Sequence, residues 1–271
     1  MTQAATLGPT SDFSRIAAHY DATRDVPPQR LATCYERMVQ LGFLPRRGIL
    51  LDAGCGTGQM SLPLAGMGYE LCGIDISLKM ISIARAKFTP DRATRFVVAD
   101  ARAIPFADSS FHAVVLSKLL QHVQGWQTAC RELVRAVKPG GCIVHIAERG
   151  AFGNAVRQYF AQRADGLGFP DRFLGMRDKS ELIDFLSSQG CPSIPVDVTD
   201  LKWEKQITFG EALGQLRDRL LAEFWYLPSE VYDRLLCETA RWIDEQPDGR
   251  ATIEHMTPYL VADVFRKVAE T

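Results

Sequence analysis

The stretch ILLDAGCGTGQM, residues 49–60, decides the fold of this chain. Apolar residues run into an acid at Asp52, and glycine then occupies every second position from 54 to 58. An apolar run that ends in glycines is typical of a buried strand followed by a tight turn. Glycine lets the backbone turn sharply and approach a ligand that any side chain would keep away. The pattern therefore predicts a strand with either a structural turn or a ligand-binding loop at its carboxyl end.

The spacing of the glycines bears on the kind of ligand. A dinucleotide loop of the dehydrogenase kind has the pattern G-x-G-x-x-G, whereas this loop has G-C-G-T-G and closes one residue early. The helix predicted after the loop would offer free N–H groups and the positive end of its dipole to an anionic group. The loop alone leaves the structural and the ligand-binding interpretations open.

Residues 48 to 148 alternate between short apolar runs and helical patterns. The predicted strands are GILLDAG, YELCGIDIS, TRFVVAD, FHAVVLS and CIVHIAE. Helices are predicted between them in QMSLPLAGMG, in LKMISIARAKF with Ser77 as its N-cap, and in WQTACRELVRAV, which KPGG closes. Continuous apolar strands separated by helices indicate an α/β fold, in which a doubly wound, mostly parallel sheet is covered on both faces.

The pattern changes after Glu148. We predict helices in AFGNAVRQYFAQ, in KSELIDFLSSQG and at residues 209–225 and 229–243. An extended sixth strand is predicted in SIPVDVTDLKWEKQITF, and a seventh and last strand in PYLVADVF. The helices at 209–225 and 229–243 would form a cap inserted before the last strand.

Composition excludes several classes of partner. Charged residues make up 23% of the 271 residues and the net charge is −1, so the chain lacks the basic surface that nucleic acid requires. The first residues lack the pattern of a secretory leader, and no segment reaches the roughly 18 apolar residues of a membrane span. Seven cysteines without C-x-x-C spacing are typical of reduced core thiols. We expect a cytoplasmic protein that binds no nucleic acid, membrane or metal.

Acidic side chains and a backbone N–H group lie at the ends of the second and third predicted strands. Asp75 stands 17 positions past Gly58, where a carboxylate can accept hydrogen bonds from two ribose hydroxyls. Asp100 ends the third strand and could accept from an adenine amino group, while the N–H of Ala101 could donate to a ring nitrogen. An Asp at a strand end is by itself more often a solvated cap, and each of these residues alone leaves that interpretation open. Together they favour a ligand at the carboxyl edge of the sheet, where open α/β sheets bind theirs.

The segments LDAGCGTG, GIDIS, VVADARAIPFADSSFHAVVLS and LVRAVKPGG resemble, in order and spacing, the motifs of the class I S-adenosylmethionine-dependent methyltransferases, over about residues 12–150. The resemblance implies a seven-stranded Rossmann-like methyltransferase fold with S-adenosyl-L-methionine as cofactor. It further implies methyl transfer to O, N or C of a hydrophobic small molecule, in a pathway such as secondary metabolism. The chain would then comprise an N-terminal helical cap segment at 1–45, a cofactor-binding core at 46–150, the remaining core elements with the inserted substrate cap at 151–258, and the final strand at 259–271.

The resemblance also implies nine cofactor-binding positions. They are Tyr20, Gly54, Gly56, Asp75, Ile76, Met80, Asp100, Ala101 and Ser117. The two glycines would pass under the methionine part, Asp75 would hold the ribose, and Ile76 and Met80 would enclose the adenine.

The remaining positions complete the implied site. Asp100 and Ala101 would contact the adenine edge, and the backbone of Ser117 would lie near the methionine amino group. Tyr20, in AAHYDATRD, would close over the sulfonium, although a partly buried helix tyrosine is an equally good interpretation.

Methyl transfer is an in-line displacement in which the cofactor carries the difficult chemistry, so a nucleophilic side chain is unnecessary. A base is needed only when the acceptor loses a proton. His122, just after the fourth strand, is the candidate catalytic base or substrate contact, with a structural or cofactor-orienting role as the alternative. The candidate substrate-binding residues come from an aromatic-rich cap that would enclose a nonpolar pocket. They are Phe152, Tyr159, Trp203 and Trp225.

Two other functions stay open. A protein could bind S-adenosylmethionine and use the sulfonium for a non-methylating reaction such as a cyclisation. A nicotinamide-dependent oxidoreductase is disfavoured by the G-C-G-T-G spacing.

Overall fold

The computed structural model describes residues 11–23, 26–88, 93–150, 153–170 and 173–269. The chain divides into two compact units. The first unit comprises Met1–Ala147, Leu174–Leu201 and Val261–Thr271, and the second comprises Glu148–Phe173 and Lys202–Leu260. The boundaries expected at residues 45, 150 and 258 remain predictions.

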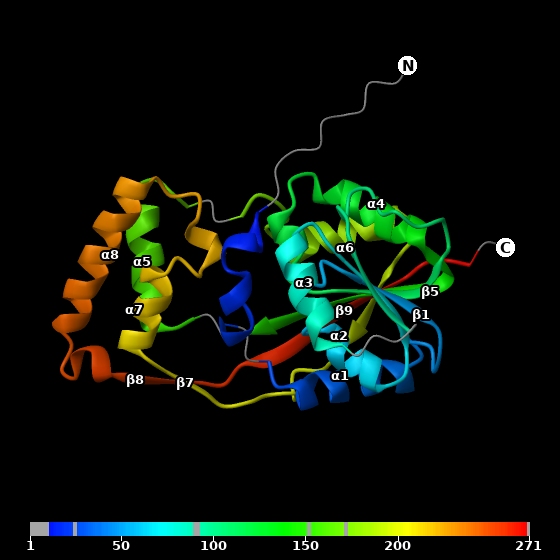
Figure 1. Cartoon of the computed structure of the whole chain (residues 1–271), viewed down its shortest axis with the longest axis horizontal. Coiled ribbons are helices and arrows are strands. Elements are labelled where there is room, and N and C mark those ends of the chain that lie inside the picture. Colours follow the sequence, from blue (N-terminus) through cyan, green and yellow to red (C-terminus); the bar gives the residue numbers. More distant parts are fainter. Residues whose placement is uncertain (1–10, 24–25, 89–92, 151–152, 171–172, 270–271) are drawn as a thin grey trace, which may run out of the picture. The chain divides into compact units, whose positions relative to one another are not determined.

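The first unit is built on a seven-stranded sheet with the order β3-β2-β1-β4-β5-β9-β6 (Figure 1). Its strands are β1 (Ile49–Ala53), β2 (Glu70–Asp75), β3 (Thr94–Val98), β4 (Phe111–Leu116), β5 (Val137–Arg149), β6 (Ser193–Val196) and β9 (Tyr259–Arg266). The neighbours from β3 through β5 pair in parallel, whereas β6 and β9 are antiparallel. The predicted α/β fold with a mostly parallel seven-stranded sheet is therefore confirmed.

Helices cover both faces of this sheet. The α-helices of the first unit are α1 (Pro28–Gln40), α2 (Ser61–Gly66), α3 (Leu78–Lys87), α4 (Trp126–Ala136) and α6 (Lys179–Ser188). In Figure 1, α4 and α6 lie on one side of the sheet and α1 and α2 on the other. Leu133 of α4 and Leu186 of α6 join Leu51 and Val114 of the sheet in one buried cluster. Apolar strands and one apolar stripe per helix thus form a layered core.

The single extended sixth strand is a wrong prediction. Strand β6 ends at Val196, because Asp197 accepts hydrogen bonds from the N–H of Thr199 at 2.9 Å and from its hydroxyl at 2.7 Å, which turns the chain. The second half of the segment forms β7 (Lys205–Thr208), which pairs antiparallel with β8 (Ile253–Met256) in a separate sheet.

The helix expected at 209–225 is also shorter than predicted. Helix α7 (Phe209–Arg217) ends before Arg219, whose φ is +51°, and a 3-10 turn follows at Ala222–Phe224. The hydroxyl of Tyr232 donates to the carbonyl of Leu216 at 2.6 Å and satisfies one of the carbonyls at the helix end.

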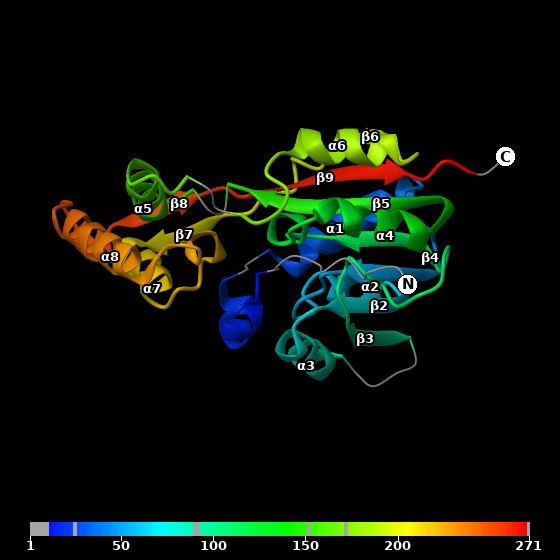
Figure 2. The ribbon, with the colours of Figure 1, turned by 90° about the horizontal axis from the view of Figure 1, so that it is seen from above.

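The second unit has its own core. It contains α5 (Ala155–Gly166), α7, α8 (Ser229–Asp244) and the β7–β8 sheet (Figure 2). Phe160, Phe224 and Tyr232 are fully buried at its centre. Across the described ranges of both units, no helix combines the length and the apolar character that crossing a bilayer demands.

Candidate functional site

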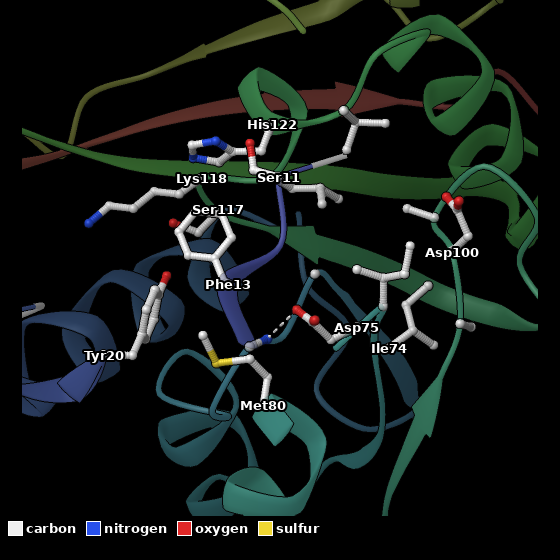
Figure 3. Close-up of a pocket in the computed structure, with 17 residues that line it drawn as sticks. Ser11, Phe13, Tyr20, Ile74, Asp75, Met80, Asp100, Ser117, Lys118 and His122 are labelled. Atoms are coloured by element: carbon white, nitrogen blue, oxygen red, sulfur yellow. Dashed lines mark hydrogen bonds between the residues drawn. The ribbon is translucent and has the colours of Figure 1, made fainter. Parts of the chain in front are cut away.

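A cavity opens at the carboxyl ends of β1, β2, β3 and β4 in the first unit (Figure 3). All nine predicted cofactor-binding residues and the candidate base line it. These are Tyr20, Gly54, Gly56, Asp75, Ile76, Met80, Asp100, Ala101, Ser117 and His122. The other lining residues were not predicted, and they are Ser11, Phe13, Ile74, Ala99, Lys118, Leu119 and Val123.

The two glycines of the loop are needed for different reasons. Both have positive φ, +71° at Gly54 and +54° at Gly56. A Cβ on Gly54 would lie 2.7 Å from the side chain of Leu119, so packing within the protein already requires glycine there. At Gly56 the nearest atom to such a Cβ would be 3.8 Å away, on Tyr20. Gly56 is therefore the position at which bare backbone faces the cavity.

Asp75 joins the glycine loop to the end of β2. Its Oδ2 accepts from the N–H of Gly56 at 3.0 Å (Figure 3). Its Oδ1 accepts from the N–H of Ser77 at 2.8 Å. Burial raises the pKa of Asp75 above its ordinary value, although these two hydrogen bonds oppose the shift. Each carboxylate oxygen keeps acceptor capacity for a ligand hydroxyl.

Asp100 has a partner that the sequence analysis missed. The guanidinium of Arg102 donates to it at 2.7 Å and 3.0 Å, and the backbone N–H of Arg102 adds a bond of 2.8 Å. Burial would raise the pKa of Asp100, but the hydrogen bonds from Arg102 outweigh it and hold that pKa below the ordinary value. The two-residue spacing in Asp-Ala-Arg was the signal for this pair. Asp100 thus lines the cavity as an ionised group that is already hydrogen-bonded.

A second buried acid lies behind the loop. Asp52, at the end of β1, is 1% exposed and accepts a hydrogen bond from the hydroxyl of Ser61 on α2. Burial raises the pKa of Asp52 to about 6, against the opposing effect of that hydrogen bond. The sequence showed this residue only as the acid at the end of the apolar run.

The segment Ser11–Thr23, which we call the strap, contributes Ser11, Phe13 and Tyr20 to the cavity. The hydroxyls of Ser14 and Ser77 are 2.7 Å apart. Three 3-10 turns give the strap its fold, at Phe13–Arg15, Ala17–His19 and Asp21–Thr23.

Asp21 connects the strap to the glycine loop and to α3. It accepts from the hydroxyl of Thr57 in the glycine loop at 2.5 Å and forms an ion pair with Lys87 on α3. Because the strap forms part of the cavity wall, these contacts connect the glycine loop to the residues that enclose the cavity.

His122 ends a 3-10 turn, Leu120–His122, that follows β4. Its ring lies edge-on to that of Phe13, with centroids 4.8 Å apart, and its carbonyl accepts from the N–H of Ser11 at 3.1 Å. Phe13 also meets Tyr20 edge-on at 6.0 Å. The strap therefore places aromatic rings beside the candidate base.

Of the four candidate substrate residues, the three that the structure describes lie outside the cavity. Phe152 is outside the described residues. Tyr159, Trp203 and Trp225 belong to the second unit and do not line the cavity. Tyr159 stacks on Trp242 at 4.6 Å, and the indole N–H of Trp225 donates to the carbonyl of Arg219 at 2.7 Å. Their role toward a substrate stays a prediction.

The chain is similar to known methyltransferases in sequence and in fold. The chain matches the methyltransferase domain family over residues 51–145. A demethylmenaquinone methyltransferase of Thermus thermophilus is 33% identical over 166 residues, which cover 58% of this chain and 74% of that protein. The chain belongs to the class I S-adenosylmethionine-dependent methyltransferases. The cofactor of this methyltransferase family is S-adenosylmethionine.

The similarity to other members is partial in length. A demethylmenaquinone methyltransferase of Renibacterium salmoninarum is 37% identical over 138 residues, which cover 50% of this chain and 56% of that relative. The chain thus spans about half the length of this relative. The YcgJ protein of Bacillus subtilis superposes with a TM-score of 0.57 at 17% identity, over 89% of this chain and 99% of that one. Phosphoethanolamine N-methyltransferase 2 of Haemonchus contortus, solved with S-adenosylmethionine, gives 0.52 at 19%, over 94% and 57%. At identities of 17% and 19%, these two structures show that this chain shares their fold.

Proposed function

We propose that this methyltransferase transfers the methyl group of S-adenosylmethionine to O, N or C of a hydrophobic small molecule. The observation that carries the proposal is the hydrogen bond between Asp75 and the loop N–H of Gly56, in a cavity lined by all nine expected cofactor residues. Family membership supports the cofactor, and the geometry of the cavity supports where it binds.

The residues present fit the adenosyl group. Asp75 keeps lone pairs for the ribose hydroxyls, and the bare backbone of Gly56 lets the ligand lie close to the main chain. Met80 is buried against one side of the cavity and Ile76 is 45% exposed, so both offer apolar surface to a base. Arg102 fixes the orientation of the Asp100 carboxylate at the adenine end.

In this proposal the cofactor supplies a methyl group activated by the positively charged sulfur. The protein binds the nucleoside, aligns the acceptor and excludes water, and alignment alone can lower a barrier by roughly 7–11 kcal/mol. Phe13 and Tyr20 of the strap supply apolar walls for the acceptor end. His122, at the same end, takes the proton of an acceptor that loses one on attack.

The nature of the acceptor rests on two observations. The named relatives act on demethylmenaquinone, a small molecule. However, the family match ends at residue 145, before the second unit begins at Glu148. We therefore infer a hydrophobic small-molecule acceptor of a biosynthetic pathway, such as secondary metabolism, that need not be the one the relatives use.

All seven cysteines are free thiols, and thiols stay reduced in the cytosol. We therefore propose that the enzyme is cytoplasmic.

Incubation with methyl-labelled S-adenosylmethionine and a panel of hydrophobic phenols, amines and enols tests the proposal. The expected result is labelled product together with one equivalent of S-adenosylhomocysteine. Binding of the cofactor followed by a cyclised, unmethylated product would favour the rival use of the sulfonium. Calorimetry that detects NAD but no S-adenosylmethionine would favour an oxidoreductase, which the loop spacing argues against.

A further inference from the structure

Lys118 is a charged residue in the cavity wall that the proposed function leaves without a role. It is half-buried and follows Ser117 directly after β4. Its φ is +53°, a backbone conformation that residues with a Cβ seldom adopt and that Gly or Asn would take at lower cost. A lysine with this strained backbone conformation, in the wall of a cavity, indicates a role for its side chain.

The position of Lys118 along the cavity restricts that explanation. In Figure 3, Asp100 lies at one end, Tyr20 and Lys118 lie at the opposite end, and Asp75 lies between them. A nucleoside held by Asp75, with its base toward Asp100, directs the rest of the cofactor toward Lys118.

The chemistry of the cofactor supplies the complementary group. Its amino-acid tail ends in a carboxylate that is ionised at neutral pH, and removing an unpaired carboxylate from water is costly. Among the described residues that line the cavity, Lys118 is the one lysine or arginine. Arg102 is not in the cavity wall and is bonded to Asp100.

We propose that Lys118 binds the carboxylate of the methionine part of the cofactor. The ion pair fixes the direction of the tail and hence where the methyl group faces the acceptor. It also makes the site prefer adenosyl compounds that carry the amino-acid tail. The inference rests on the proposed function, because it takes the nucleoside to lie at the Asp75 end.

The test compares two ligands by calorimetry. S-adenosylhomocysteine carries the tail, whereas 5′-methylthioadenosine has the same nucleoside and sulfur without it. The variants are Lys118→Met, which keeps the length of the chain but removes the charge, and Lys118→Arg, which keeps the charge. Lys202→Met, at an exposed lysine of the second unit, is the matched control.

Lys118→Met is expected to weaken the binding of S-adenosylhomocysteine about tenfold, because a charge-assisted hydrogen bond that solvent partly screens is lost. It should leave 5′-methylthioadenosine within about twofold, Lys118→Arg should restore most of the affinity, and the control should change neither ligand. Equal losses for both ligands, or none for either, would overturn the assignment. If the unaltered enzyme binds both ligands equally well, Lys118 has no carboxylate to hold and the inference fails while the proposed function stands. If it binds neither, the proposed function fails first and the inference with it.

Discussion

Asp75 at the end of β2 accepts the backbone N–H of Gly56, in the loop after β1, at 3.0 Å. One carboxylate thus connects the loop to the neighbouring strand while its remaining lone pairs face the cavity. The site depends on this hydrogen bond, because the bond keeps the side-chain-free backbone of Gly56 next to the Asp75 carboxylate, which can accept hydrogen bonds from a ligand.

The first prediction concerns this carboxylate. Asp75→Ala should weaken the binding of S-adenosylhomocysteine by roughly 1.5–3 kcal/mol, because charged hydrogen bonds to the ribose are lost. Calorimetry against Asp108→Ala, an exposed acid outside the cavity, provides the control. Affinity should also fall on acidification, because protonating Asp75, whose pKa is raised, removes the acceptor. Unchanged affinity in Asp75→Ala would refute the ribose assignment.

The second prediction separates the possible roles of His122. His122→Ala should reduce kcat far more than it reduces affinity for S-adenosylhomocysteine, because a base acts on the acceptor and not on the cofactor. His255→Ala, at an exposed histidine of the second unit that does not line the cavity, serves as the matched control and should retain most of the kcat. Parallel losses of kcat and cofactor affinity in His122→Ala would instead identify a positioning residue.

A third prediction concerns the strap. Asp21→Ala removes the acceptor of the Thr57 hydroxyl and the ion-pair partner of Lys87. If the strap must open to release cofactor, S-adenosylhomocysteine should dissociate several-fold faster in this variant. Stopped-flow displacement measures the rate, with Asp218→Ala in the second unit as control. An unchanged dissociation rate would mean that the Asp21 contacts do not limit release.

The fourth prediction follows from Asp52. Its folded pKa of about 6 exceeds the ordinary 3.8, so the folded state binds more protons between these values and stability falls as pH rises through this window. The cost at neutral pH is about 3 kcal/mol, from roughly two pKa units at 1.36 kcal/mol each.

Urea unfolding of the wild type and of Asp52→Asn from pH 4 to 7.5 measures this effect. The stability of Asp52→Asn relative to the wild type should increase by about 3 kcal/mol across the window, because the amide carries no charge to bury. Parallel curves for the two proteins would show that Asp52 titrates normally.

The parts of the fold that the sequence predicts well are those with local signals. Continuous apolar runs mark β1 to β5, and the hydroxyl of Ser77 caps α3 by accepting from the N–H of Met80 at 3.2 Å, as expected. Asp75 and Asp100 could be named because Asp75 ends β2 and Asp100 follows β3, and the carboxyl ends of parallel strands meet at one edge. Tyr20 and Met80 do not follow strands, and only the family resemblance pointed to them.

The failures occur where tertiary contacts override the pattern. The apolar residues beyond Val196 suggested one strand, but Arg37 of α1 holds the Asp200 carboxylate at 2.6 Å and 2.8 Å across the turn that ends β6. Helix α7 stops at Arg217 despite continuing helical spacing, because Arg219 reverses the backbone and its guanidinium lies over the ring of Tyr232 at 4.0 Å. Arg102 was not predicted as the partner of Asp100, because an arginine two residues after an acid is ordinarily solvated.

A crystal structure with S-adenosylhomocysteine tests the account most directly. The two ribose hydroxyls are predicted to lie within hydrogen-bond distance, roughly 2.6–3.2 Å, of the Asp75 oxygens, with the thioether passing over Gly56. A nucleoside bound away from Asp75, or a cavity that stays empty at saturating ligand, would contradict it.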